Sequence, residues 1–203
     1  MKPYIYLAST SPRRRELLRQ IGVNFETLTF RHGERGEDAD VDETPFADED
    51  AVRYVERLAL TKAQAGMRRL LWRDMRRQPV LAADTTLELD GKLIGKPTDI
   101  ADAYSILGRL SGRTHRVLTA VAISDGEHTR SRVSLSEVRF RELGEHEIRR
   151  YIATNEPMDK AGAYGIQGRA AVFVESISGS YSGIMGLPLF ETAQLLEAFG
   201  YPL

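Results

Sequence analysis

Hydrophobic residues recur along the chain with two different periods, which separate predicted helices from predicted strands. The helix period is clearest from about Asp50 to Arg73, where apolar residues return every three or four positions. Shorter runs with this period predict further helices at 12–21, 99–110, 145–153 and 188–199. Short apolar or alternating runs between turn residues predict strands at 4–8, 25–30, 80–84, 115–124, 130–140 and 171–177, and a hairpin over 86–93. Predicted loops include 31–50, 159–168 and 179–183.

Helices and strands alternate early in the sequence, and a stretch rich in hairpins follows. This order predicts an α/β fold with a mixed central sheet flanked by helices. A chain of 203 residues can bury one sizeable core, or form two lobes that share a cleft. We therefore predict a single domain over residues 1–203, elongated into two lobes.

Composition and charge exclude several classes of protein. The net charge of −1 argues against general binding to nucleic acid or to an acidic membrane surface. The absence of cysteine excludes disulfides, thiolate zinc sites and a cysteine nucleophile. No apolar run approaches the roughly 18 residues of a membrane span, and the first residues do not resemble a signal peptide. We therefore expect a cytoplasmic protein.

The apolar run Val80–Ala83 ends abruptly in a carboxylate, Asp84, followed by Thr85 and Thr86. Continuous apolar runs are typical of strands buried on both faces. Open α/β sheets place their chemistry just beyond the carboxyl ends of the strands. Asp84 is therefore a candidate catalytic carboxylate, although its position alone is equally consistent with a residue that caps a turn.

Three arginines, Arg13 to Arg15, occupy the first turn of a helix that Ser11 and Pro12 are predicted to start. The helix dipole favours anions at this end, so the arginines have the unfavourable sign. Free backbone N–H groups together with arginine side chains are well suited to bind a phosphate. The alternative is a solvated basic turn without a ligand.

Further charged residues could complete a phosphate site. Lys62 lies close to the apolar stripe of its helix, so it either extends along the surface to solvent or points into a cleft. Lys96 follows the hairpin and precedes a proline. The polar loop 31–50 is dominated by acids, of which one or two could hold Mg²⁺ together with substrate phosphates.

If these groups converge, they form a site for a polyphosphate and its metal ion. A carboxylate beside it could orient or deprotonate a water for in-line attack at phosphorus. This favours hydrolysis or transfer at a phosphoanhydride, without indicating which phosphorus is attacked or which nucleotide is bound. The histidines show no metal-ligand spacing, and His115, alone on a strand, is interpreted as structural.

Six ordered motifs resemble those of the Maf family, nucleoside triphosphate pyrophosphatases also known as septum formation inhibitors. The resemblance extends from about Tyr4 to Phe199. The motifs are Leu7-Ala8-Ser9-x-Ser11-Pro12-Arg13-Arg14, Ala83-Asp84-Thr85, Gly95-Lys96-Pro97, Ser111-Gly112-x-x-His115, the run Asp159-Lys160-Ala161-Gly162-Ala163-Tyr164-Gly165-Ile166-Gln167-Gly168, and Gly186-Leu187-Pro188.

The resemblance implies a fold similar to that of the inosine triphosphate pyrophosphatases, with a cleft between two lobes. It implies cleavage of a nucleoside triphosphate to the monophosphate and pyrophosphate with Mg²⁺ or Mn²⁺, by a homodimer. Asp84 matches the general base, and Glu43 and Asp84 are the expected metal ligands. Glu43 follows a loop, 31–40, that looks longer and more acidic than is usual in the family. The expected substrate-binding residues are Ser9, Arg13, Arg14, Lys62, Lys96 and Lys160.

Arg13, Thr85 and Gln167 match the specificity positions of the branch that acts on dTTP and UTP. The Gln167 amide can accept from N3–H of thymine or uracil and donate to a neighbouring carbonyl, whereas cytosine lacks that donor. An unpaired buried polar group costs about 1–3 kcal/mol, which sets the scale of discrimination. The alternative for Gln167 is an amide bonded to its own loop backbone. The alternative functions are the same chemistry on a modified purine triphosphate, or a nucleotide-binding regulator of cell division without turnover.

Overall fold

The computed structural model describes residues 3–29 and 41–203. In this part of the chain a seven-stranded sheet has the order β2-β1-β3-β5-β6-β7, and β4 pairs with β3. Strand β1 is parallel to β2 and β3, and the other pairs are antiparallel. The strands are β1 (Ile5–Leu7), β2 (Phe25–Thr27), β3 (Val80–Leu89), β4 (Lys92–Ile94), β5 (Thr114–Ser124), β6 (Thr129–Phe140) and β7 (Val174–Ser178). The predicted mixed sheet is confirmed.

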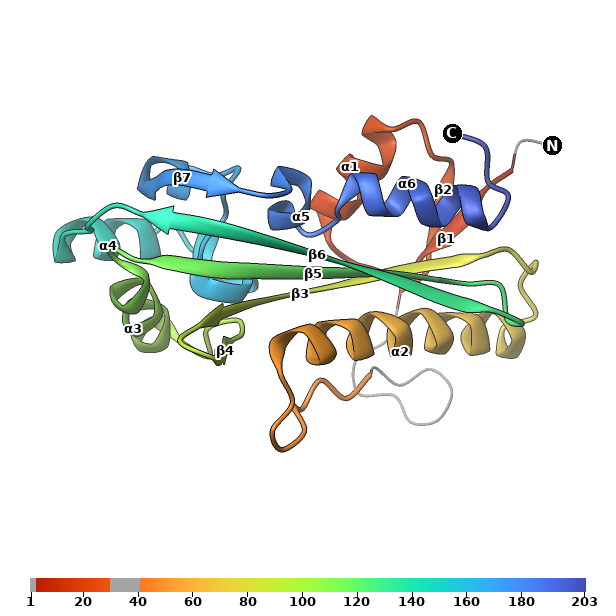
Figure 1. The fold of residues 1–203 in the computed structure, drawn as a ribbon, viewed down its shortest axis with the longest axis horizontal. Helices are drawn as coiled ribbons and strands as arrows, with labels where there is room; N and C mark the ends of the chain where they lie inside the picture. Colours follow the sequence, from red (N-terminus) through yellow and green to blue (C-terminus); the bar gives the residue numbers. More distant parts are fainter. Residues whose placement is uncertain (1–2, 30–40) are drawn as a thin grey trace.

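Helices cover both faces of this sheet (Figure 1). Helix α2 runs along one face, and α1, α5 and α6 lie over the other, while α3 and α4 lie at the far end of the long strands. The helices are α1 (Pro12–Gln20), α2 (Ala51–Trp72), α3 (Ile100–Leu110), α4 (Glu145–Ile152), α5 (Tyr181–Met185) and α6 (Leu189–Ala198). None of these helices combines the length and apolar character that a membrane span requires.

The apolar stripe of α2 explains how this helix packs on the sheet. Val55, Ala59 and Ala63 are fully buried and form one core cluster with residues of β3 and β5. At Gly66 a Cβ atom would lie 2.7 Å from Val80 Cγ1, so glycine permits the close approach of α2 to β3. A second cluster, which includes Leu17 of α1 and Leu195 of α6, fills the opposite face.

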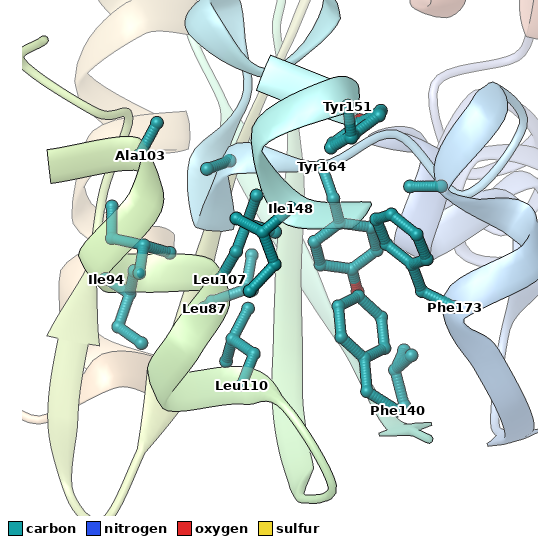
Figure 2. Packing of buried hydrophobic residues seen from close by; sticks show 14 of the residues in the cluster. Leu87, Ile94, Ala103, Leu107, Leu110, Phe140, Ile148, Tyr151, Tyr164 and Phe173 are labelled. Carbon is teal, nitrogen blue, oxygen red and sulfur yellow. The ribbon is translucent and has the colours of Figure 1, made fainter. Parts of the chain in front are cut away.

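A third apolar cluster occupies the far end of the long strands (Figure 2). Leu87 of β3 and Phe140 of β6 pack there with residues of α3 and α4. Tyr164, from the predicted loop 159–168, also joins this cluster. The long strands β3, β5 and β6 thus connect two groups of cores, one at each end of the molecule.

The prediction that a strand ends at Asp84 is wrong. Strand β3 continues to Leu89, because β5 pairs with it without interruption as far as Glu88. The parallel neighbour β1 stops earlier, where Leu7 pairs with Leu81. Asp84 therefore lies beyond the carboxyl end of β1, in the middle of its own strand.

Two segments near the C-terminus also differ from the prediction. The predicted strand 171–177 begins as a 3₁₀ helix, η4 (Arg169–Phe173), because the third-residue spacing buries Ala170 and Phe173 together. The predicted loop 179–183 contains α5, whose first turn is capped by Ser180 Oγ accepting from the Gly183 N–H. Phe30, at the end of the predicted second strand, lies outside the described residues, as does the first half of the acidic loop, residues 31–40.

Candidate active site

A cleft of about 540 Å³ lies beside the middle of β3. Its walls come from the β1–α1 connection, α2, β3, the segment after β4, residues 159–167 and the end of α5. All ten residues predicted for the site line it, although they come from distant parts of the sequence. They are Ser9, Arg13, Arg14, Glu43, Lys62, Asp84, Thr85, Lys96, Lys160 and Gln167.

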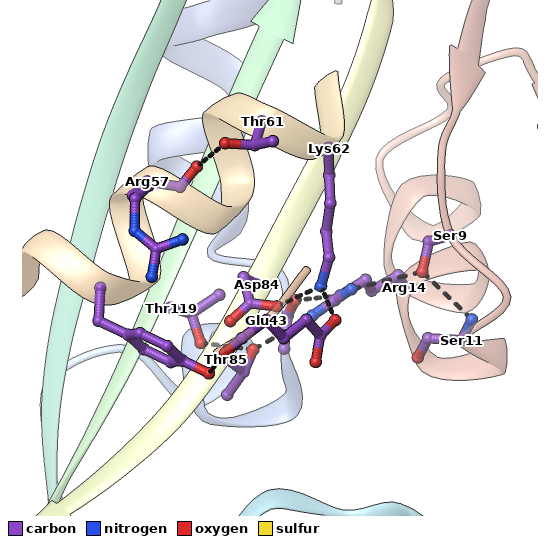
Figure 3. Close-up of polar contacts among 12 residues, drawn as sticks. Ser9, Ser11, Arg14, Glu43, Arg57, Thr61, Lys62, Asp84, Thr85 and Thr119 are labelled. Carbon is purple, nitrogen blue, oxygen red and sulfur yellow. Dashed lines mark hydrogen bonds and ion pairs between the residues drawn. The ribbon is translucent and has the colours of Figure 1, made fainter. Parts of the chain in front are cut away.

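Lys62 points from α2 into this cleft, where its ammonium lies between two carboxylates (Figure 3). Lys62 Nζ is 2.6 Å from Asp84 Oδ1 and 2.5 Å from Glu43 Oε1. The Asp84 side chain is 11% exposed, whereas that of Glu43 is 50% exposed. Asp84 therefore presents a buried carboxylate to the cleft and does not cap a turn, and Lys62 does not extend to bulk solvent.

The cations around Glu43 keep its carboxylate ionised. Burial acts to raise the pKa of Glu43. The positive charges of Lys62 and, to a lesser extent, of Lys96 and Arg14 outweigh burial, so the pKa is lowered overall. Burial and the charges of Asp84 and Glu43 raise the pKa of the nearby Tyr54 phenol to about 12. Tyr54 is therefore a hydrogen-bond donor at neutral pH, and its hydroxyl donates to the backbone oxygen of Glu43 over 3.0 Å.

The Arg14 guanidinium connects three walls of the cleft. It donates from Nε to the Gly186 carbonyl over 2.8 Å, and its terminal nitrogens donate to Thr85 Oγ1 and Ser9 Oγ. Thr85 in turn bonds Thr119, which gives its hydroxyl proton to a backbone carbonyl of α5. Because Thr119 has one proton to give, Thr85 must donate to Thr119. This chain fixes the Thr85 hydroxyl and leaves it able to accept from a ligand.

Asp159 lies between two further cations of the cleft. Arg13 Nη1 is 4.0 Å from Asp159 Oδ2, and Lys160 Nζ is 2.6 Å from the other carboxylate oxygen. Lys96 and Gln167 are both exposed. Within the described residues the Gln167 amide has no hydrogen-bond partner, so the alternative in which it bonds its own loop is not observed.

The donor set of the cleft fits a hard divalent cation that also binds a polyphosphate. Glu43 and Asp84 bring carboxylate oxygens to one point, and Mg²⁺ needs only one or two protein carboxylates when substrate phosphates complete its shell. Across residues 3–29 and 41–203 no group of three or more acidic, histidine or cysteine side chains is placed to hold a metal by itself.

Some residues that support the site could not be recognised in the sequence. Thr119 faces Thr85 only because β3 and β5 pair in this register, which no local pattern reveals. Tyr54 precedes Lys62 by about two helical turns, so the two residues share one face of the helix, and this spacing was the one signal in the sequence that Tyr54 could lie near the site. His115 is buried and lies outside the cleft lining, in agreement with its structural interpretation.

The chain is similar to known proteins over nearly its whole length. A family model described as "Maf-like protein" matches residues 4–199. The chain is 74% identical to a protein of Aromatoleum aromaticum over the full length of both chains. It is 57% identical to a protein of Dechloromonas aromatica over 97% of this chain and 98% of the other. Both relatives are named dTTP/UTP pyrophosphatase. The chain belongs to the Maf family.

Proposed function

We propose that this protein hydrolyses dTTP and UTP, and modified uridine triphosphates of similar shape, to the nucleoside monophosphate and pyrophosphate. The observation that carries the proposal is the meeting of Lys62, Glu43 and Asp84 inside a cleft lined by further cations. The names of the relatives support the choice of substrate. A volume of about 540 Å³ lies within the range of small-molecule sites.

The phosphates are proposed to bind at the first turn of α1. Backbone N–H groups at a helix start attract anions, and Arg13 and Arg14 add guanidinium groups at the same place. Lys96 and Lys160 approach from the other walls, and Ser9 adds a hydroxyl. These groups hold the triphosphate so that its α-phosphorus lies beside Asp84.

Asp84 is proposed to act as the general base. It accepts a proton from a water while the water oxygen bonds to the α-phosphorus. The bond from that phosphorus to the oxygen bridging it to the β-phosphate breaks, and pyrophosphate leaves with the bridging oxygen. Lys62 holds the Asp84 side chain in place through the 2.6 Å contact between its Nζ atom and Asp84 Oδ1.

A divalent cation, Mg²⁺ or Mn²⁺, is proposed to be held by Glu43 and Asp84 together with the substrate phosphates. When bound, such an ion neutralises charge that develops on the phosphate oxygens. Selection of the base is proposed to depend on Gln167, whose free amide can pair with N3–H and a carbonyl of uracil or thymine, with Thr85 and Arg13 as further contacts. We also propose that the protein acts in the cytoplasm as a single-domain homodimer.

A panel of triphosphates tests this function directly. Purified protein is incubated with Mg²⁺ and dTTP, UTP, CTP, GTP, ATP or a methylated GTP, and pyrophosphate release is measured. We expect dTTP and UTP to be cleaved fastest. We expect Asp84→Asn to lose at least about a hundredfold in rate, the usual scale for removing a general base, while its circular dichroism stays unchanged. Preference for a purine would contradict the assigned selectivity, and tight binding without pyrophosphate release would favour the regulator.

A further inference from the structure

We propose that Arg57 and Tyr54 are positioning residues that hold Glu43 in place to bind the divalent cation. The inference rests on the proposed function, because it assumes that Glu43 is a ligand of that cation. Both residues lie on α2, the helix that also carries Lys62. They act through residues 41–49, which we call the Glu43 segment.

The Glu43 segment needs such support because it makes no regular secondary structure. Residues 41–46 belong to neither a helix nor a strand, so no ladder of backbone hydrogen bonds fixes them. The Glu43 side chain is half exposed, and within the described residues its one ion pair is with the Lys62 ammonium, which is shared with Asp84. Without other contacts the carboxylate would be free to leave the cleft when a cation or phosphate displaces Lys62.

Arg57 makes contacts with three residues of the Glu43 segment. Its Nε and Nη2 atoms donate to the two carboxylate oxygens of Glu49 over 2.6 and 2.7 Å. Nη2 also donates to the Thr44 carbonyl over 3.2 Å, next to Glu43 in the chain. The centre of its guanidinium lies 4.0 Å from the centroid of the Phe46 ring. A planar, forked cation is required for this combination, which lysine cannot reproduce.

Tyr54 holds the backbone of Glu43 itself. Its hydroxyl donates to the Glu43 carbonyl, and its ring also lies beside the Arg57 guanidinium, 5.6 Å from ring centroid to guanidinium carbon. Figure 3 shows Arg57, Thr61 and Lys62 following one another along α2 above Glu43. The helix that places Lys62 therefore also places the carboxylate opposite it.

Binding of Mn²⁺ measures this role without turnover. We would titrate Mn²⁺ against the protein with the α,β-imido analogue of dTTP bound and follow free Mn²⁺ by electron paramagnetic resonance. We expect Arg57→Met to weaken Mn²⁺ binding roughly tenfold, the lower end of what loss of a supporting contact costs at metal sites. At saturating Mn²⁺ the turnover number of Arg57→Met with dTTP should return to the wild-type value, because Asp84 and Lys62 are untouched.

Three variants sharpen the test. Arg53→Met is the matched control, since Arg53 lies one turn earlier on α2 and its side chain is 81% exposed. It should bind Mn²⁺ as the wild type does. Phe46→Ala, at an exposed site that does not endanger folding, should weaken binding about two- to fivefold if the stacking contributes. In the double variant, Arg57→Met should not weaken Mn²⁺ binding beyond the loss that Glu43→Gln already causes.

The outcomes separate this inference from the proposed function. If Glu43→Gln weakens Mn²⁺ binding but both Arg57→Met and Phe46→Ala leave it unchanged, the positioning role is overturned and the metal role of Glu43 stands. If Arg57→Met weakens binding equally in the Glu43→Gln background, Arg57 does not act through Glu43. If Glu43→Gln itself has no effect, the proposed metal ligand is wrong and the inference falls with it.

Discussion

The Lys62 ammonium determines how much negative charge the cleft presents to a ligand. Its single positive charge is shared by Glu43 and Asp84 and offsets one of their two negative charges, while Asp159 lies between Arg13 and Lys160. Among the described residues that line the cleft, five are cationic and three are carboxylates, which leaves a local charge of +2. The whole chain has a charge of −1, so the cleft is more positive than the molecule as a whole, and this local charge attracts a polyanion.

Gln167 offers the sharpest test at the scale of one residue. Gln167→Ala removes the amide proposed to read the base and leaves the phosphate contacts unchanged. We expect the ratio of kcat/KM for dTTP over CTP to fall roughly tenfold, since the variant loses two hydrogen bonds to the base, each worth about 0.5–1.5 kcal/mol. Initial rates of pyrophosphate release with both substrates provide the measurement. An unchanged ratio would refute the assigned role, and unchanged unfolding of the variant would exclude a general defect.

At this scale the sequence was a good guide because the chemistry of each side chain is carried by its identity. Asp84, Lys62 and Glu43 were identified from charge, spacing and family resemblance, and all three line the cleft. Their partners could not be identified in this way. That Lys62 bridges the two carboxylates depends on how α2 lies across β3, which is a property of packing.

At the scale of elements, the loop that carries Gln167 is held by the helix before it. Tyr151, on α4, accepts a hydrogen bond from the Gly165 N–H over 3.2 Å and donates to Glu156 Oε1 over 2.9 Å. The other carboxylate oxygen of Glu156 accepts from the Arg169 N–H. A Cβ atom on Gly168 would lie 2.2 Å from Glu156 Oε1, so the carboxylate packs directly against the loop backbone.

Tyr151→Phe tests this anchor. The change leaves the buried Gly165 N–H without its acceptor, which should lower the free energy of unfolding by about 1–3 kcal/mol. Because the loop is loosened while Asp84 and Lys62 stay in place, KM for dTTP should rise with little change in kcat. Urea unfolding and steady-state kinetics give the two values. Tyr104→Phe is the control, since within the described residues the Tyr104 hydroxyl has no hydrogen-bond partner. A fall in kcat with KM unchanged would contradict the anchor.

The elements show where sequence patterns fail. Helix α2 was predicted within a residue or two because twenty-two residues repeat one period. The length of β3 was predicted incorrectly, because the polar residues at 84–86 were taken as its end. These residues stay in the strand because β5 satisfies their backbone groups, and pairing with a distant strand leaves no local signal.

At the scale of the whole molecule, the far core is tied to the cleft through a buried aromatic group. His115 is 1% exposed, and its Nε2 lies 2.8 Å from the Tyr164 hydroxyl. Its ring meets Phe140 and Tyr164 edge-on, at 5.1 and 5.5 Å between centroids. The Tyr164 side of this cluster also lines the cleft. One wall of the cleft therefore packs on a core in which His115 is buried and neutral.

This buried, neutral state makes the stability of the fold depend on pH. Burial lowers the pKa of His115 to about 4, from an ordinary value of 6.5 that the unfolded chain regains. Between these two values the unfolded state binds more protons than the folded state. The contribution of a neutral His115 to the free energy of unfolding is therefore complete above about pH 6.5 and is lost as the pH falls towards 4. Over that window the loss amounts to about 3 kcal/mol.

The variant His115→Gln isolates this contribution, because glutamine can still bond the Tyr164 hydroxyl but does not titrate. Urea unfolding is measured near pH 7 and near pH 5. Between these two conditions the free energy of unfolding should fall by about 2 kcal/mol more in the wild type than in His115→Gln. His146→Gln is the control at an exposed histidine that makes no ion pair within the described residues, and it should keep the wild-type dependence. Carboxylates contribute equally to all three proteins, so they cancel in the comparison. Equal losses in the wild type and His115→Gln would show that the folded protein accepts a charge on His115, and that the far core does not enforce its neutrality.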